Sequence, residues 1–188
     1  MSHPDHDSAV RALLDKQEIT ELLTRYLRSA DRGDAAGLAA CYLPGATEDH
    51  GGVFTGTAED YVADITPVLT HPRGRTMHCM TNVLIDLDGD TAAAESYVVT
   101  FSAVRTPDGP GSSFVGARIL DRLERHDGRW GIAHRALLWE WSHDAAAAET
   151  WLFGMLVPDT DVLTRGAKYP ADPVYAGTAR AQANGAAQ

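Results

Sequence analysis

The chain has 188 residues and a formal net charge of −10, which argues against a nucleic-acid-binding protein, because contact with phosphates requires clustered Lys and Arg. Hydrophobic residues make up 44% and charged residues 22%, which is ordinary for a soluble globular protein, and the length suits one domain with a substantial core. No apolar run reaches the length of a membrane span, and the N-terminus lacks the apolar stretch of a signal peptide. We therefore expect a cytoplasmic protein.

Three helices are expected in the first 70 residues. Residues 9–32 carry apolar side chains at intervals of three and four, which predicts a long amphipathic helix. Its apolar stripe consists of Ile19, Leu22, Leu23, Tyr26, Leu27 and Ala30. Gly33 ends this helix and Asp34 caps a short second one. Thr57, with Asp60 three residues later, resembles a capping box and opens a third helix through Tyr61, Ile65 and Leu69.

The remaining pattern indicates strands. Long runs rich in Val, Ile, Thr, Tyr and Trp are separated by turn residues, and Asp-Gly in such a setting is a strong hairpin signal. They cover residues 76–87, 91–105, 112–125 and 129–142, and a short strand at residues 46–50 precedes them. Because the runs are long, we expect a strongly curved antiparallel sheet. Helices followed by strands predict an α+β fold, a cone-shaped barrel with the N-terminal helices over the concave face and a pocket inside.

The C-terminal part differs in composition. Residues 1–145 are expected to form the domain, and residues 146–188 an extension with one more helix around residues 151–156 and a small, polar, flexible end. Cys41 and Cys79 lie in apolar surroundings without the spacing of a zinc site, so we expect two reduced, buried thiols.

Strand parity predicts which polar side chains meet in the pocket, because alternate residues share a face. The residues that this argument brings together are His78 and Asn82 from the strand at 76–87, Glu48 and His50 from the short strand, Arg135 and Trp139 from the last strand, and Tyr26 and Asp31 from the end of the first helix. A few convergent polar groups among apolar walls are typical of a small-molecule site.

Asp31, His78 and Arg135 are the expected catalytic residues. A neutral imidazole can take a proton from carbon, and a buried carboxylate on its other nitrogen fixes the tautomer and stabilises the imidazolium. An arginine opposite can hold negative charge that develops on an enolate oxygen or a leaving group. Arg135 could equally be a structural ion-pair partner of Glu95 or Glu140. This chemistry needs no metal, and without a Gly-rich phosphate loop we expect no cofactor.

Four segments of the chain together match a known pattern, over about residues 9–142. They are Arg25-Tyr26 leading to Asp31-Arg32-Gly33-Asp34, then His78-Cys79-Met80-Thr81-Asn82, Asp86-Leu87-Asp88-Gly89-Asp90-Thr91-Ala92, and Asp121-Arg122-Leu123-Glu124-Arg125-His126-Asp127-Gly128-Arg129-Trp130. With these segments the chain resembles the SnoaL-like branch of the nuclear transport factor 2-like superfamily.

The resemblance implies roles for several side chains. The pairing of Asp31 with His78 is similar to the dyad of hexachlorocyclohexane dehydrochlorinase, scytalone dehydratase and bile acid dehydratase, in which the histidine removes a proton and a neighbouring carbon loses chloride or hydroxyl. Arg135 matches an arginine of the dehydrochlorinase and the bile acid enzyme, and Tyr26 matches a tyrosine of the latter. His50 departs from the pattern, because two of these dehydratases carry a tyrosine there, although a histidine can still donate a proton.

The second histidine of scytalone dehydratase has no counterpart in this chain. Val99 or Phe101 occupies that region, and these two residues, with Val115, are expected to contact the substrate. The resemblance therefore does not transfer a substrate. The first hypothesis is a cofactor-independent lyase that acts by dehydratase-type elimination on a hydrophobic small molecule such as a steroid, terpenoid or polyketide.

Two alternatives remain open. An isomerase or cyclase would begin with the same proton abstraction, and a ligand-binding or accessory subunit would catalyse nothing. The expected partners are the small-molecule substrate and further copies of the chain in a dimer or trimer, with no nucleic acid and no membrane.

Overall fold

The computed structural model describes residues 6–71, 74–106, 109–146 and 166–175. In these ranges the elements follow one another as α1 (His6–Arg32), α2 (Ala35–Ala39), β1 (Tyr42–Asp49), β2 (Thr55–Thr57), α3 (Ala58–Leu69), β3 (Thr76–Asp88), β4 (Thr91–Thr106), β5 (Gly109–His126) and β6 (Arg129–Ala146). Among the helices described, none is long and apolar enough to cross a membrane.

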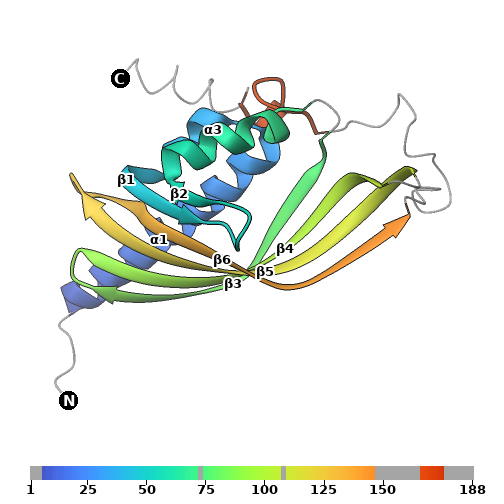
Figure 1. Ribbon diagram of the computed structural model, residues 1–188. Helices are drawn as coiled ribbons and strands as arrows, with labels where there is room; N and C mark the ends of the chain where they lie inside the picture. The colour runs from blue at the N-terminus through green and yellow to red at the C-terminus, as the bar shows by residue number, and fades with distance from the viewer. Residues whose placement is uncertain (1–5, 72–73, 107–108, 147–165, 176–188) are drawn as a thin grey trace.

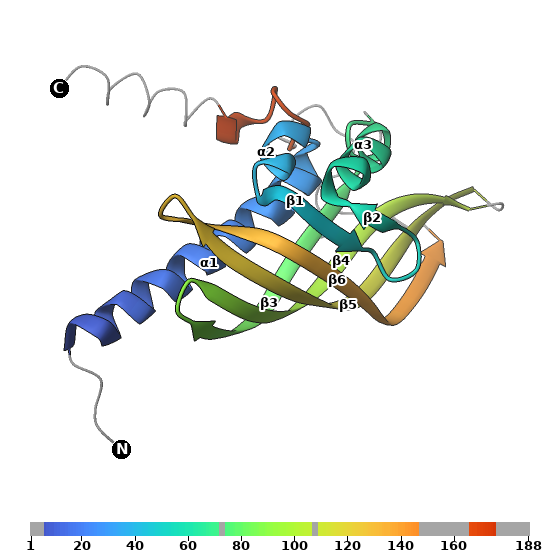
Figure 2. The ribbon, with the colours of Figure 1, turned by 60° about the vertical axis from the view of Figure 1, so that its left-hand side comes forward.

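The six strands form one strongly curved sheet in the order β2-β1-β6-β5-β4-β3, with α1 and α3 over its concave face (Figures 1 and 2). The expected α+β class and the position of the helices are confirmed. Two details differ from the expectation. The sheet is open, with β2 and β3 at its edges, and β1 runs parallel to β6, so the sheet is mixed. No hairpin joins β1 to β6, and therefore no local turn sets their relative direction.

The apolar stripe of α1 enters the core as predicted. All six of its residues are at most 7% exposed: Ile19, Leu22, Leu23, Tyr26, Leu27 and Ala30. They pack against buried aliphatic residues of the sheet, among them Ile119, Leu123 and Ile132. Burial of this stripe against the concave face fixes the end of α1, and with it Asp31, beside the strands.

Side-chain caps begin the two shorter helices. The Asp34 carboxylate accepts from the backbone N–H of Gly37, and the Thr57 hydroxyl accepts from that of Asp60, so both predicted caps are confirmed. Between α1 and α2 the backbone turns at Gly33, whose φ is +67°. A Cβ there would lie 2.7 Å from the carbonyl oxygen of Leu69, so glycine allows the turn to pack against the end of α3.

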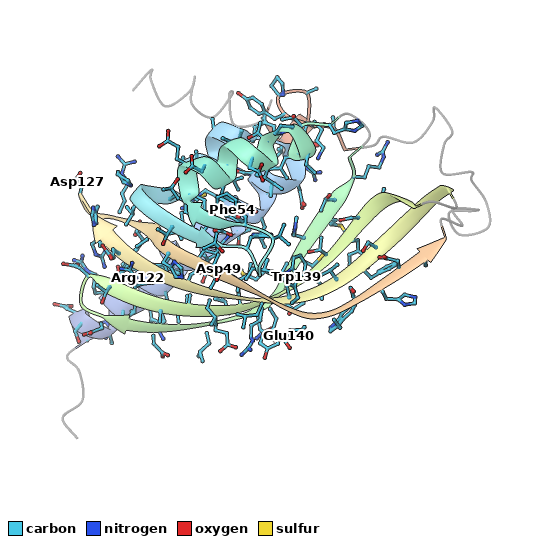
Figure 3. The ribbon with its side chains drawn as sticks, viewed as in Figure 1. Asp49, Phe54, Arg122, Asp127, Trp139 and Glu140 are labelled. Atoms are coloured by element: carbon cyan, nitrogen blue, oxygen red, sulfur yellow. The ribbon has the colours of Figure 1, made fainter. Side chains whose placement is uncertain are left out.

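β-Bulges change which side chains face the concave side of the sheet. In β3 the pairing with β4 slips by one residue at Thr81, and the alternation of faces reverses beyond it. Ile85 is therefore buried, whereas Leu84 is 62% exposed. In β6 one slip leaves Glu140 without a partner in β5, and another leaves Ala133 without one. Figure 3 shows Trp139 on the helix-covered side of β6 and Glu140 on the other side.

Residues 166–175 pack against the C-terminal end of α1. The backbone N–H of Tyr169 donates to the carbonyl oxygen of Arg32 at 2.6 Å, and the Lys168 ammonium donates to that of Asp31 at 2.8 Å. The Asp172 carboxylate pairs with Arg32 at 3.5 Å. The helix expected around residues 151–156 and the flexible end expected at residues 179–188 lie outside the described residues.

Candidate functional site

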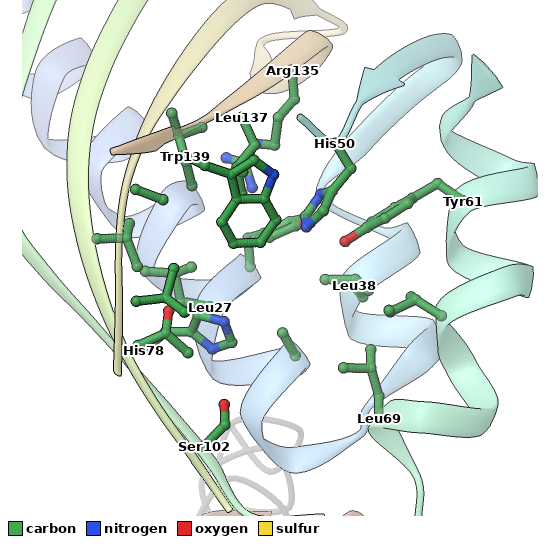
Figure 4. A pocket seen from close by; sticks show the side chains of 18 residues that line it. Leu27, Leu38, His50, Tyr61, Leu69, His78, Ser102, Arg135, Leu137 and Trp139 are labelled. Atoms are coloured by element: carbon green, nitrogen blue, oxygen red, sulfur yellow. The ribbon is translucent and has the colours of Figure 1, made fainter. Parts of the chain in front are cut away.

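A cavity of about 210 Å³ lies between the helices and the concave face of the sheet (Figure 4). Most of its wall is apolar, and its polar groups come from strands and helices that are far apart in the sequence. The lining residues are Tyr26, Leu27, Ala30, Leu38, His50, Tyr61, Ile65, Leu69, His78, Val98, Thr100, Ser102, Val115, Ala117, Ile119, Arg135, Leu137 and Trp139.

Asp31 and His78 form a close pair at the edge of this cavity. The ring Nδ1 of His78 lies 2.6 Å from Oδ1 of Asp31, and the backbone N–H of His78 donates to Oδ2 of the same carboxylate at 3.0 Å. The side chains are 23% and 11% exposed, respectively. Because an ionised carboxylate only accepts hydrogen bonds, Nδ1 carries the proton, and Nε2 of neutral His78 has a free lone pair.

Arg135 is buried in the opposite wall. Its Nε and Nη2 donate to the two oxygens of Asp121 at 2.7 and 2.9 Å, and its guanidinium carbon lies 3.8 Å from the centre of the Tyr26 ring. Burial alone would lower the pKa of Arg135, but the Asp121 carboxylate outweighs it and raises this pKa well above the ordinary value. Within the described residues Nη1 of Arg135 has no hydrogen-bond partner. A buried donor without a partner is costly, and a ligand oxygen in the cavity would satisfy it.

A cluster of hydroxyl groups surrounds the buried carboxylate of Glu48. Tyr42 donates to Oε2 of Glu48 at 2.6 Å, and the hydroxyls of Tyr42 and Tyr26 lie 3.3 Å apart. Burial raises the pKa of Tyr26, Tyr42 and Tyr61, so these phenols stay protonated and act as donors. Glu48 also binds His50, whose Nδ1 lies 2.9 Å from Oε1.

The structure places most of the predicted site residues around one cavity. Tyr26, His50, His78, Val115, Arg135 and Trp139 line it, Asp31 holds His78, and Glu48 lies directly behind His50. The cavity therefore brings together polar groups of α1, β3, β6 and the residue that follows β1.

Three predicted residues are not in the cavity wall. Asn82 lies beyond the bulge at Thr81, so it is exposed and does not share a face with His78. Val99 and Phe101 point to the convex side of β4, because the residue opposite His78 is Thr100 and directly paired residues share a face. The residues of β4 that do line the cavity are Val98, Thr100 and Ser102.

Tyr61 lines the cavity but was not among the site residues predicted from the sequence. The predicted apolar stripe of α3, formed by Tyr61, Ile65 and Leu69, faces the cavity as a whole. Since that helix was expected on the concave face of the sheet, its stripe was a signal that could have found all three. Among the described residues, no group of three or more His, Cys, Asp or Glu side chains is arranged to hold a metal ion.

Comparisons with known proteins agree with this architecture. The sequence model of the SnoaL-like domain family matches residues 11–136. No curated protein matches the chain in sequence. The structure is similar to that of a type 2 hexachlorocyclohexane dehydrochlorinase, with a TM-score of 0.67, 20% identity, and coverage of 74% of this chain and 95% of that one.

Two further solved structures are also similar in fold to this chain. The type 3 hexachlorocyclohexane dehydrochlorinase of Novosphingobium barchaimii has a TM-score of 0.66 at 19% identity, with coverage of 74% of this chain and 96% of that one. A protein of Novosphingobium aromaticivorans, provisionally described as a scytalone dehydratase, has a TM-score of 0.62 at 18% identity, with coverage of 84% and 93%. At such low identity these likenesses show a shared fold.

Proposed function

Because the chain belongs to the SnoaL-like domain family, we propose that it is a cofactor-independent lyase that carries out a dehydratase-type β-elimination on a hydrophobic small molecule such as a steroid, terpenoid or polyketide. The observation that carries the proposal is the 2.6 Å contact between Asp31 and Nδ1 of His78 at the cavity wall. The dehydrochlorinases with a similar fold also act by elimination, as their name states, and this supports the reaction class.

The base in this reaction is Nε2 of His78. It takes a proton from the carbon next to a carbonyl group, and Asp31 stabilises the imidazolium that forms because its carboxylate already holds the proton on Nδ1. General-base catalysis of this kind contributes about 10²- to 10⁴-fold to a rate. The second hydrogen bond, from the backbone N–H of His78 to Asp31, keeps the carboxylate aligned with the ring.

Arg135 stabilises the enolate oxygen. Hydrogen bonds to Asp121 hold its guanidinium in position. Its Nη1, which has no partner among the described residues, can donate to a substrate oxygen. A preorganised donor that is aimed at developing charge typically accounts for about 10²- to 10³-fold in turnover. The guanidinium is locked by two hydrogen bonds and by the Tyr26 ring, so it needs little reorganisation during the reaction.

The cavity supports a compact, apolar substrate. Its volume of about 210 Å³ lies below the roughly 300 Å³ at which pockets for drug-sized ligands begin. Within the proposed classes, a substrate with one or two rings therefore fits better than a four-ring steroid. Aliphatic side chains of α1, α3 and the sheet would enclose the rings, and the polar groups would fix the carbonyl and the hydroxyl.

The proposal is tested with a panel of one- and two-ring β-hydroxy ketones. We expect the pure protein to convert a member of the panel into a product lighter by one water, and His78→Ala to lower turnover at least about 100-fold. His126→Ala is the matched control, because His126 is exposed at the end of β5, and it should retain normal turnover. Full turnover by His78→Ala would remove the proposed base.

Product analysis separates the alternatives. A product of unchanged mass that still depends on His78 would identify an isomerase or cyclase, since both begin with the same proton transfer. Recovery of an unmodified, bound ligand from the wild-type protein would identify a binding or accessory module.

A further inference from the structure

A second histidine–carboxylate pair lies in the wall of the same cavity. His50 follows the end of β1, and its Nδ1 lies 2.9 Å from Oε1 of Glu48. Glu48 has a fully buried side chain, and its other oxygen accepts from the Tyr42 hydroxyl at 2.6 Å. The proton on Nδ1 of His50 therefore points to Glu48, and Nε2 is left for the cavity. Figure 4 shows His50 and His78 projecting into the cavity from two sides.

The ring of His50 is held more firmly than a surface side chain. It stacks on Tyr61, with ring centroids 4.9 Å apart and planes 25° apart, and it meets Trp139 edge to face at 6.0 Å. Its backbone N–H donates to the carbonyl oxygen of Phe54 at 2.8 Å. Within the described part of the chain, no hydrogen bond engages Nε2. The nitrogen is thus fixed in direction and available to a ligand.

Glu48 is a buried carboxylate whose negative charge needs a positive partner. An isolated carboxylate in the protein interior is costly unless a positive group compensates it. The guanidinium of Arg135 donates to both oxygens of Asp121, and among the described residues it makes no hydrogen bond to Glu48. The other groups that face His50 and Glu48 are the phenols of Tyr26 on α1, Tyr42 on β1 and Tyr61 on α3, which burial keeps neutral. Among the described groups that contact Glu48, His50 is the one that can carry a positive charge.

The negative charge of the Asp31 carboxylate is compensated in a different way. Its carboxylate accepts the backbone N–H of His78 as well as the ring N–H, and it is partly exposed to water. The ammonium group of Lys168, bonded to the carbonyl oxygen of Asp31, adds a positive charge nearby. Asp31 thus has a backbone donor and a nearby positive charge in addition to the ring of His78.

From these two environments we infer that His50, positioned by Glu48, is the general acid that protonates the leaving hydroxyl, opposite the base His78. In the balanced step, Nε2 of His78 takes the α proton and the α C–H electron pair becomes the new double bond. The β C–O bond breaks with its electron pair on oxygen, and Nε2–H of His50 protonates this oxygen, which leaves as water. His78 then releases its proton to solvent and His50 takes one up. The inference rests on the proposed elimination.

The charge state of the two rings provides a test without any substrate. In ¹⁵N-histidine-labelled protein at pH 7, we expect both nitrogens of His50 to be protonated and His78 to be neutral with its proton on Nδ1. The signals are identified by their loss in His50→Gln and His78→Ala, and Glu48→Gln should leave His50 neutral. A neutral His50 in the wild-type protein would overturn this inference alone, whereas a charged His78 would count against the proposed base.

Two probes with one carbon skeleton provide the kinetic test. A β-hydroxy ketone needs a proton on its leaving group, whereas the matching β-(4-nitrophenoxy) ketone expels a stable phenolate. We expect His50→Gln to lose on the order of 100-fold in kcat with the hydroxyl probe and at most a few-fold with the nitrophenoxy probe. His78→Ala should lose activity with both. Equal losses by His50→Gln on both probes would overturn the role as an acid, and full activity of His78→Ala would overturn the proposed function instead.

Discussion

At the scale of single residues, the guanidinium of Arg135 has neighbours of three kinds. Two of its nitrogens, Nε and Nη2, bind Asp121, its face covers the Tyr26 ring, and its third nitrogen, Nη1, has no partner among the described residues. The carboxylates that the sequence offered as structural partners, Glu95 and Glu140, are not its partners. Their position on the convex side of the sheet places them next to a different arginine, Arg118, at 3.1 and 3.0 Å. The buried pair with Asp121 thus holds in place the positive charge of Arg135, which the proposed reaction uses.

Removing one member of this buried pair should be strongly destabilising. Asp121→Asn leaves Arg135, which is 2% exposed, with an uncompensated charge, and loss of a partner from a buried ion pair costs about 3–5 kcal/mol. We expect a decrease of this size in the free energy of unfolding, measured by urea denaturation. Glu140→Gln is the control, because it breaks a half-exposed ion pair with Arg118 and should cost about 1 kcal/mol or less. A cost below about 1 kcal/mol for Asp121→Asn would contradict the ionised pair.

At the scale of elements, the end of α1 depends on residues that follow it by more than 130 positions. The last carbonyl groups of a helix have no partners within the helix. Lys168 and Tyr169 supply donors to those of Asp31 and Arg32, so residues 166–175 complete the helix end that carries the proposed dyad.

Lys168→Met tests this contribution. The substitution keeps a long apolar stem but removes the ammonium donor, and we expect a loss of about 1 kcal/mol in the free energy of unfolding. Burial lowers the pKa of Lys168, which indicates that its ammonium group has given up part of its water to reach Asp31. Lys16→Met, an exposed position on the same helix, is the control and should change stability by less than about 0.5 kcal/mol. Equal effects of the two substitutions would show that the contact contributes nothing.

The helix caps and the strand bulges differ in how well the sequence alone predicts them. The caps at Asp34 and Thr57 depend on neighbours within three residues, and both were predictable. The bulge at Thr81 has no such local signal, because it arises from the pairing of β3 with β4. One extra residue moved Asn82 to the convex face, and parity alone could not have shown this.

At the scale of the whole molecule, the site depends on contacts that no local pattern encodes. Asp31 and His78 are separated by 47 positions; their places at the helix end and on the strand put both in the predicted pocket, and the family resemblance supported their pairing as a dyad. The periodicity of α1 predicted which face is buried, but the parallel pairing of β1 with β6 and the approach of residues 166–175 come from the assembled fold. Glu48 and His50 were foreseen as pocket residues, yet their mutual hydrogen bond appears only once β1 takes its place in the sheet.

The same assembly buries three phenols in one polar cluster, and this determines how the whole fold responds to alkaline pH. Burial raises the pKa of Tyr26, Tyr42 and Tyr61 above the ordinary value of 10.0. A group whose pKa is raised in the folded state contributes its full stability below the unfolded value and loses it as the pH rises toward the folded value. The protein should therefore lose stability above about pH 10, by about 1.4 kcal/mol per pH unit for each phenol and about 4 kcal/mol for the three together.

Urea unfolding between about pH 9 and pH 11, followed together with tyrosinate absorbance, measures this slope. In the folded protein the three phenols should stay protonated, and they should ionise in one cooperative step that coincides with unfolding. Tyr42→Phe should reduce the slope by about one third, because one linked group is removed. Tyr97→Phe, on the half-exposed convex face, is the control and should leave the slope unchanged. A smooth titration of all tyrosines before unfolding would mean that water reaches the cluster around Glu48, and the charge balance argued for Glu48 and His50 would then lose its physical basis.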